Sequence, residues 1–252
     1  MGNFVILIGG PGLFKGCDKA HDQNWTNYIV PVQLAAQRNL YNRQSSETVH
    51  WVLYEPPYRK RWLDDSVITK KEKLEDDGYH LHSVRQSAAQ RVLAKRSGSY
   101  LHRIKAIAVI HGITYKEINS PNEFWNYLQS LGDNTITRVW YSGHASPDGL
   151  MLASTYLANA FTKDMILNKD LSTKGGLRKK FNKTPQKVSK FYRCYTEGFA
   201  MEWNKVFGVS AAGAKVKIDF GVIDRTSSIV NVMERIETTP TSEGNPDWTV
   251  HK

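Results

Sequence analysis

The chain has 252 residues, of which 40% are hydrophobic and 11% aromatic, and this composition excludes disorder over most of its length. Two cysteines cannot build a disulfide framework, so both thiols remain open to chemistry and a reducing compartment suits them. The 34 lysines and arginines outnumber the 24 acidic residues. The resulting net charge of +10 predicts attraction to nucleic acid, an anionic surface or an acidic polypeptide.

The apolar run at the start of the chain, Phe4–Ile8, is too short for a signal peptide or a transmembrane helix. We therefore expect no membrane insertion and a cytoplasmic location, with export by a route that needs no signal peptide left open.

Short apolar runs recur along the chain and end at glycine, proline or polar residues, as buried strands do. They are Phe4–Ile8, Val49–Tyr54, Ile104–Ile110, Ile136–Tyr141, Val188–Cys194 and Val216–Phe220. Several runs lack alternation, which is typical of strands covered on both faces. The sequence thus predicts an α/β fold with a mainly parallel sheet flanked by helices on both faces.

Two helices can be placed between these strands. Ser120 and Pro121 are a typical N-cap and first helical residue, and Gly132 closes the segment that follows them. A second helix is predicted over residues 196–206, with Gly208 at its end.

A basic segment connects two of the predicted strands. Between Lys163 and Lys190 there are nine lysines and arginines but only two aspartates, a net charge of +7. We expect a single domain over residues 1–236, with a basic insertion at about 146–187, and an exposed polar tail over residues 237–252. Because of its position, the basic segment is expected near any cleft formed by the strands it connects.

A histidine and a cysteine follow two of the predicted strands. The strand that ends at Tyr141 continues as Ser142-Gly143-His144, and a later strand ends at Cys194, directly before the second predicted helix. Ligands of parallel sheets bind beyond the carboxyl ends of the strands, so both side chains are expected in one cleft. A thiol beside a helix N-terminus is favoured as thiolate, the nucleophilic form.

These two motifs, Tyr141-Ser142-Gly143-His144 and Tyr192-Arg193-Cys194-Tyr195-Thr196-Glu197-Gly198, resemble the active-site motifs of the caspase-like cysteine peptidases, the group of caspases, gingipains and legumains. The resemblance covers residues 104–221 and includes the order of elements. It implies a caspase-like fold and a cysteine endopeptidase that needs no cofactor and no metal.

The resemblance also implies roles for individual residues. Cys194 is the nucleophile, His144 the proton donor to the leaving amine, and the backbone N–H groups of Ala145 and Cys194 form the oxyanion hole. Ala145 stands where the family usually has glycine, and Arg193 where it has a small or acidic residue. Arg193 and the basic segment suggest an acidic polypeptide substrate.

Other histidines and glycines give competing hypotheses. His111 also ends an apolar run and competes with His144 as the base, or could line an esterase oxyanion hole. The nearest nucleophile elbow, residues 208–213, lacks the second glycine. The glycine-rich residues 9–16 are interpreted as a turn and not as a phosphate loop, and Cys17 with its acidic and histidine neighbours as a chance cluster and not as a metal site.

Two further functions remain open from the sequence. One is a catalytically inactive caspase-like protein that binds an acidic partner through the basic segment. The other is nucleic-acid binding, although the segment has few interleaved aromatic residues and no reading motif.

Overall fold

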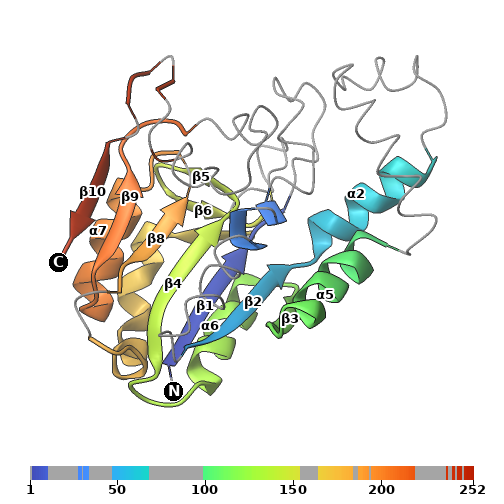
Figure 1. Ribbon diagram of the computed structural model, residues 1–252. Helices are drawn as coiled ribbons and strands as arrows, with labels where there is room; N and C mark the ends of the chain where they lie inside the picture. The colour runs from blue at the N-terminus through green and yellow to red at the C-terminus, as the bar shows by residue number, and fades with distance from the viewer. Residues whose placement is uncertain are drawn as a thin grey trace.

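A seven-stranded sheet forms the centre of the protein, as the computed structural model in Figure 1 shows. Its strands are β1 (Gly2–Ile8), β2 (Glu47–Tyr54), β3 (Thr114–Ile118), β4 (Ile136–Ser142), β8 (Ser189–Tyr192), β9 (Ala211–Ala214) and β10 (Trp248–His251). Their order is β10-β9-β8-β4-β1-β2-β3, and every neighbouring pair is parallel except β9 with β10. The predicted α/β class with a mainly parallel sheet is confirmed.

The structure describes residues 2–10, 28–29, 31–33, 47–67, 99–153, 164–183, 187–192, 194–218, 237, 240–241, 243–245 and 247–252. In this part of the chain, no helix is both long and apolar enough to cross a membrane.

Helices cover both faces of the sheet, and alternate residues of β1 point into two separate cores. Val5 and Leu7 belong to the core beneath α6 (Pro121–Ser130), α7 (Glu197–Phe207) and the 3-10 helix η2 (Asn168–Lys180). Phe4 and Ile6 belong to the core beneath α2 (Pro56–Val67) and α5 (Tyr100–Ile110). Burial on both faces explains why these strands are apolar without alternation.

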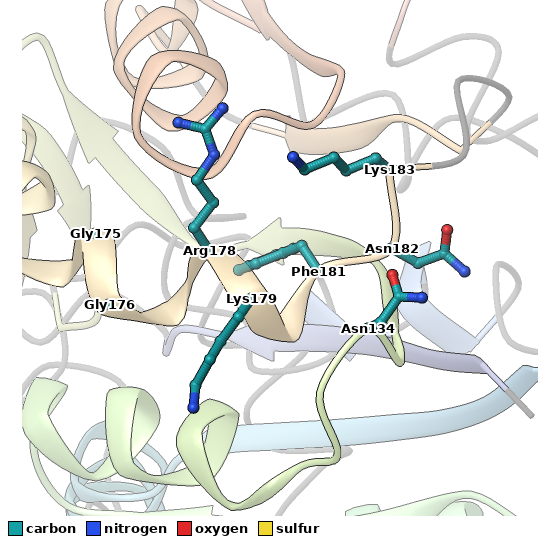
Figure 2. Close-up of a pocket in the computed structure, with 8 residues that line it drawn as sticks. All are labelled: Asn134, Gly175, Gly176, Arg178, Lys179, Phe181, Asn182 and Lys183. Atoms are coloured by element: carbon teal, nitrogen blue, oxygen red, sulfur yellow. The ribbon is translucent and has the colours of Figure 1, made fainter.

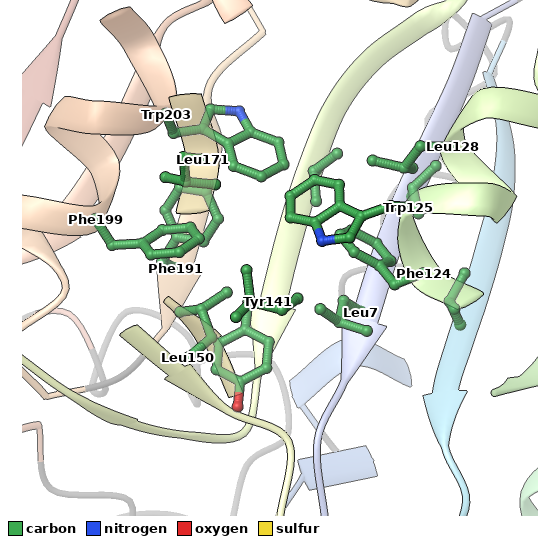
Figure 3. Packing of buried hydrophobic residues seen from close by; sticks show 14 of the residues in the cluster. Leu7, Phe124, Trp125, Leu128, Tyr141, Leu150, Leu171, Phe191, Phe199 and Trp203 are labelled. Atoms are coloured by element: carbon green, nitrogen blue, oxygen red, sulfur yellow. The ribbon is translucent and has the colours of Figure 1, made fainter. Parts of the chain in front are cut away.

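The first of these cores is rich in aromatic residues, which Figure 3 shows from close by. The rings of Trp125 from α6 and Trp203 from α7 stack with their centroids 6.1 Å apart. Phe191 of β8 packs edge-on against Phe199 and Trp203. This packing fixes the position of α7, the helix that follows Cys194, against the strand that precedes Cys194.

The predicted ends of the two helices are confirmed. The Ser120 side chain accepts a hydrogen bond from the backbone N–H of Glu123 at 3.3 Å, and α6 begins at Pro121. Gly208 ends α7 in the left-handed conformation, with φ of 66°.

The prediction of a strand over Ile104–Ile110 is wrong, because these residues belong to α5. The buried side chains of this helix recur every four residues, at Tyr100, Ile104 and Ala108, whereas Val109 and Ile110 are exposed. A continuous apolar run does not distinguish a strand from a helix, and the capping hydrogen bond at Ser99 decides for the helix.

The prediction of a strand over Val216–Phe220 is also wrong for the described residues 216–218, and residues 219–220 lie outside the described part of the chain. The strand is β9 instead, five residues earlier, with the sequence Ala-Ala-Gly-Ala. A side chain on Gly213 would stand 2.2 Å from the backbone oxygen of Thr196, so this strand needs small residues where α7 begins.

Two edge strands lie outside the predicted runs. Trp248–His251 form β10, which pairs with β9, so the expectation of an exposed tail is wrong for these residues. Thr114–Ile118 form β3 at the other edge, in which Thr114 and Lys116 are exposed and Ile118 is buried.

The basic segment is part of the folded structure. It contains the short strand β7 (Met165–Leu167) and η2, and the buried side chains of Leu171, Leu177 and Phe181 pack into the first core. It runs from the carboxyl edge of the sheet to the amino edge, where Phe181 bridges to Ile136 at the start of β4. Its described residues 168–183 therefore lead away from the strand ends that precede His144 and Cys194.

A buried carboxylate joins strands at the amino edge. Glu47, with a side chain 3% exposed, accepts hydrogen bonds from Thr137 and from Arg138, whose Nη2 lies 2.8 Å away. Burial raises the pKa of Glu47, but the hydroxyl hydrogen bond and the charges of Arg138 and Lys187 outweigh it, so the pKa lies below its usual 4.5. The guanidinium of Arg138 also stacks on the Phe4 ring, 3.9 Å from its centroid.

Candidate active site at two strand ends

The residues after β4 and β8 leave the sheet side by side. These strands are parallel neighbours, and Ser142 at the end of β4 pairs directly with Tyr192 at the end of β8. His144 comes two residues after Ser142, and Cys194 comes two residues after Tyr192. The register therefore places the histidine and the cysteine at equivalent positions beyond the carboxyl edge of the sheet.

The turn between β4 and His144 is built around one buried hydroxyl. The Tyr141 Oη lies 2.6 Å from the backbone oxygen of His144 and 2.7 Å from that of Met151. A side chain on Gly143 would stand 2.1 Å from this Oη, so only glycine fits at position 143. The glycine of the Ser-Gly-His motif is thus explained by the close approach of the Tyr141 ring.

The His144 ring is held by a buried tyrosine. The hydroxyl of Tyr28, whose residue is fully buried, lies 2.6 Å from His144 Nε2, and the two ring centroids are 5.4 Å apart. Ser142 donates its hydroxyl hydrogen to the backbone oxygen of Tyr28, 3.1 Å away. Ser142 and His144 of the motif therefore both contact Tyr28, which fixes the ring and its Nε2.

Cys194 is a free, half-buried thiol at the start of a bend. Its Sγ accepts a hydrogen bond from the backbone N–H of Ile218, 3.4 Å away. The next residue, Tyr195, has φ of 57°, a left-handed conformation that turns the chain sharply from β8 toward α7.

Thr196, which is fully buried, stabilises this bend. Its hydroxyl donates to the backbone oxygen of Phe191 and accepts from the N–H of Ala214, so it ties β8, β9 and the start of α7 together. The 11-residue helix α7 begins at Glu197, three residues after Cys194. The partial positive charge of a helix N-terminus lies close to the thiol.

A charged group also lies beside the thiol. Lys217 and Glu243 form an ion pair with 2.8 Å between Nζ and Oε1, and Tyr195 donates its hydroxyl to the same carboxylate. The hydrogen bond with Glu243 raises the pKa of Lys217 above its usual value. The residue after Lys217 is Ile218, whose backbone N–H contacts the Cys194 sulfur.

Of the other residues with a predicted role, Ala145 lies in β5 (His144–Ser146) and packs partly against the core. Arg193, Cys17 and residues 11–16 of the glycine-rich loop lie outside the described part of the chain. Among the described residues, no group of three or more histidine, cysteine, aspartate or glutamate side chains could hold a metal ion.

His111 does not end a strand. It is the C-cap of α5 and precedes the amino end of β3, whereas His144 and Cys194 follow the carboxyl ends of their strands. The structure also disagrees with the esterase hypothesis, because Gly208 ends a helix and Ser210 precedes the amino end of β9. A nucleophile elbow requires the opposite order, a strand followed by a helix.

The basic residues gather at the other edge of the sheet, around an open pocket of about 740 Å³. Figure 2 shows that Arg178 and Lys183 extend toward the same side of it, whereas Lys179 extends away. The Lys179 Nζ lies 3.5 Å from Asp133 Oδ2. Within the described residues, neither Arg178 nor Lys183 has an acidic partner. The guanidinium of Arg178 lies against Gly208, at the negative end of the α7 dipole.

Sequence reasoning missed two residues that contact the candidate site, Tyr28 and Lys217. Tyr28 lies 116 positions before His144, and Lys217 lies in a segment that was assigned to a strand. No local motif marks either of them.

Comparison of the chain with models of protein families, with curated proteins and with solved structures finds no match.

Proposed function

We propose that this protein is a caspase-like cysteine endopeptidase that hydrolyses peptide bonds through Cys194 and His144. The observation that carries the proposal is the register of β4 and β8, which puts both residues two positions beyond a directly paired Ser142 and Tyr192.

The order of elements supports the same proposal. The strand with Ser142-Gly143-His144 is followed by an insertion, then by the strand that leads to Cys194, and then by a helix. This is the order that caspase-like peptidases share. The close fit of Gly143 against Tyr141 gives the motif a physical reason in this chain.

The chemistry follows from the surroundings of the two groups. The Cys194 thiolate attacks the scissile carbonyl carbon, and the N–H groups of Ala145 and Cys194 hold the oxyanion. The C–N bond then breaks, and the leaving amine takes a proton from His144. Because Tyr28 holds Nε2, this proton comes from Nδ1. Water hydrolyses the thioester, which releases the acid and restores the thiol.

The position of the thiol is compatible with this role. Its Sγ lies 3.4 Å from the backbone nitrogen of Ile218, whose N–H donates to it, and α7 begins three residues after Cys194.

The test is cleavage of a mixed peptide library, analysed by mass spectrometry. Cys194→Ala and His144→Ala should each reduce cleavage by about 10³-fold or more, as loss of a nucleophile or its proton-transfer partner does. Cys17→Ala is the matched control and should retain activity. Iodoacetamide should inactivate the wild-type chain and the control at one thiol, Cys194. Full activity of a folded Cys194→Ala variant would end the proposal.

The basic pocket supports a second candidate function, the binding of an acidic polypeptide without cleavage. Its observation is the convergence of Arg178 and Lys183 in Figure 2, with no acidic partner for either among the described residues. Binding of a poly-glutamate peptide should weaken with salt, survive Cys194→Ala, and fall in an R178Q/K183Q variant.

K105Q/K116Q is the control for this second candidate, because it also removes two positive charges, those of the exposed Lys105 in α5 and Lys116 in β3, and neither residue lines the pocket. Equal loss of binding in the control would mean that only net charge matters. Tighter binding of an unrelated DNA duplex, with a steep salt dependence, would instead support a nucleic-acid partner.

A further inference from the structure

The chain that follows His144 forms a small antiparallel sheet, β5-β6-β7, in which β6 is Gly149–Met151. Direct pairing puts His144 opposite Met151, and Met151 opposite Met165. Directly opposed side chains lie on the same face, with Cβ atoms about 5 Å apart. His144 therefore begins a row of side chains that continues with two methionines.

The two faces of this small sheet have different surroundings. The alternate residues Ala145, Leu150 and Ile166 face the first core, where Leu150 and Ile166 are buried. The face with His144 also carries Ser146 and Leu167, which flank Gly149 in the next row.

That face borders a pocket of about 580 Å³. Its lining residues are Ser146, Asp148, Met151, Met165, Leu167, Asn168 and Lys169. Pockets of roughly 300–1,000 Å³ are of the size that holds small ligands or side chains. Four of these lining residues lie in the two cross-strand rows of the His144 face.

The pocket extends from His144 toward the helix that follows Cys194. At one end, Met151 is the cross-strand neighbour of His144. At the other end, Asn168 lies against Gly198, since a side chain on this glycine would stand 3.8 Å from Asn168 Nδ2. Gly198 is in the first turn of α7, four residues after Cys194. The pocket therefore lies between a neighbour of His144 and the first turn of the helix that follows Cys194.

We infer that this pocket binds an apolar side chain of the substrate, next to the scissile bond; the inference rests on the proposed peptidase function. Two methionines and a leucine form the apolar part of its lining, and methionine adapts to apolar side chains of different shape. The two charged residues at the rim, Asp148 and Lys169, are exposed and of opposite sign. They leave the pocket without a net charge that would attract an acidic side chain.

The first test compares matched peptide substrates that differ only in one residue flanking the scissile bond, leucine, aspartate or lysine. Wild-type kcat/KM should be at least about tenfold higher for leucine than for aspartate, the discrimination expected of an apolar pocket. Met151→Glu should reduce the leucine advantage about tenfold and favour lysine. Met201→Glu is the control, because Met201 is an exposed methionine of α7 outside the pocket.

A second measurement reads the pocket without catalysis. The rate of Cys194 alkylation is measured with N-isobutyl chloroacetamide and with its carboxymethyl analogue, in the wild type and in Met151→Glu. Faster labelling by the isobutyl reagent, lost in the variant but not in Met201→Glu, supports the pocket even if no peptide is cleaved. Cys194-dependent cleavage without an apolar preference overturns the pocket while the peptidase proposal stands. Equal labelling by both reagents overturns the pocket in either case.

Discussion

The hydroxyl of Tyr28 gives the sharpest test of how the site works. Tyr28→Phe removes the atom that lies 2.6 Å from His144 Nε2 and leaves the buried ring in place. The contact of Ser142 with Tyr28 survives, because it is made to the backbone oxygen. The variant therefore changes the position of the imidazole without opening a large cavity.

The magnitude follows from a single hydrogen bond. Its loss should lower the free energy of unfolding by about 1 kcal/mol, within the usual range of about 0.5–1.5 kcal/mol. If the same amount is lost from the transition state, where the ring must point its Nδ1 at the leaving amine, kcat falls about fivefold, since about 1.4 kcal/mol is a factor of ten. Substrate binding does not use this hydroxyl, so KM should change by less than about twofold.

The assay pairs steady-state kinetics with urea unfolding, and Tyr58→Phe is the matched control. The Tyr58 hydroxyl is also buried and donates to a backbone oxygen, that of Gly9, at 2.8 Å. Tyr58→Phe should lose similar stability but keep its kcat. An unchanged kcat in Tyr28→Phe, or the same fall in both variants, would refute the positioning of His144 by Tyr28.

Two further predictions concern substitutions at the carboxyl edge and at the amino edge of the sheet. Gly143→Ala puts a methyl group 2.1 Å from the Tyr141 hydroxyl, so it should destabilise the fold by about 1–3 kcal/mol and abolish activity. Gly175→Ala, with no atom within 4 Å of the new methyl, is its control and should be near neutral in both measurements. At the amino edge, Glu47→Gln should lower the free energy of unfolding by about 3 kcal/mol at pH 7, because it removes the negative charge that Arg138 and Lys187 face. Because the folded-state pKa of Glu47 lies below 4.5, its stabilisation is present above pH 4.5 and lost as the pH falls further. The difference between wild type and variant should therefore shrink in urea titrations below pH 4.5, and a constant difference from pH 3 to pH 7 would contradict this account.

The strands that the sequence predicts correctly are those buried on both faces. Phe4–Ile8 and Ile136–Tyr141 are continuous apolar runs because helices cover each side of them. The same pattern misleads at Ile104–Ile110, where a helix keeps one stripe buried and exposes Val109 and Ile110. Apolar composition is common to both cases, and only the four-residue spacing of the buried positions separates them.

The strands that the sequence does not predict lie toward the edges. β9 consists of alanine and glycine, because α7 packs so closely on it that larger side chains would collide with the backbone of Thr196. β10 and β3 contain polar residues that suit a sheet edge. Their place depends on partners far away in the chain, which no local pattern reveals.

Some residues of the candidate site can likewise be predicted from the sequence, and others cannot. His144 and Cys194 are predicted to be neighbours because parallel strands place their carboxyl ends together, and the pairing of Ser142 with Tyr192 agrees with that reasoning. Tyr28 and Lys217 reach the site through tertiary packing, so the sequence contains no spacing that would identify them.

The distribution of charge changes what the protein is expected to recognise. The basic segment leads away from the strand ends. Arg178 and Lys183 lie at the amino edge of the sheet, near the end of α7 that is farther from Cys194. The pocket beside His144 contains two methionines and a leucine, and its two charged residues have opposite signs. The basic segment therefore no longer supports the expectation of an acidic substrate residue at the scissile bond. Because the two pockets lie at opposite edges of the sheet, cleavage of a substrate and binding of an acidic partner can be altered by separate substitutions.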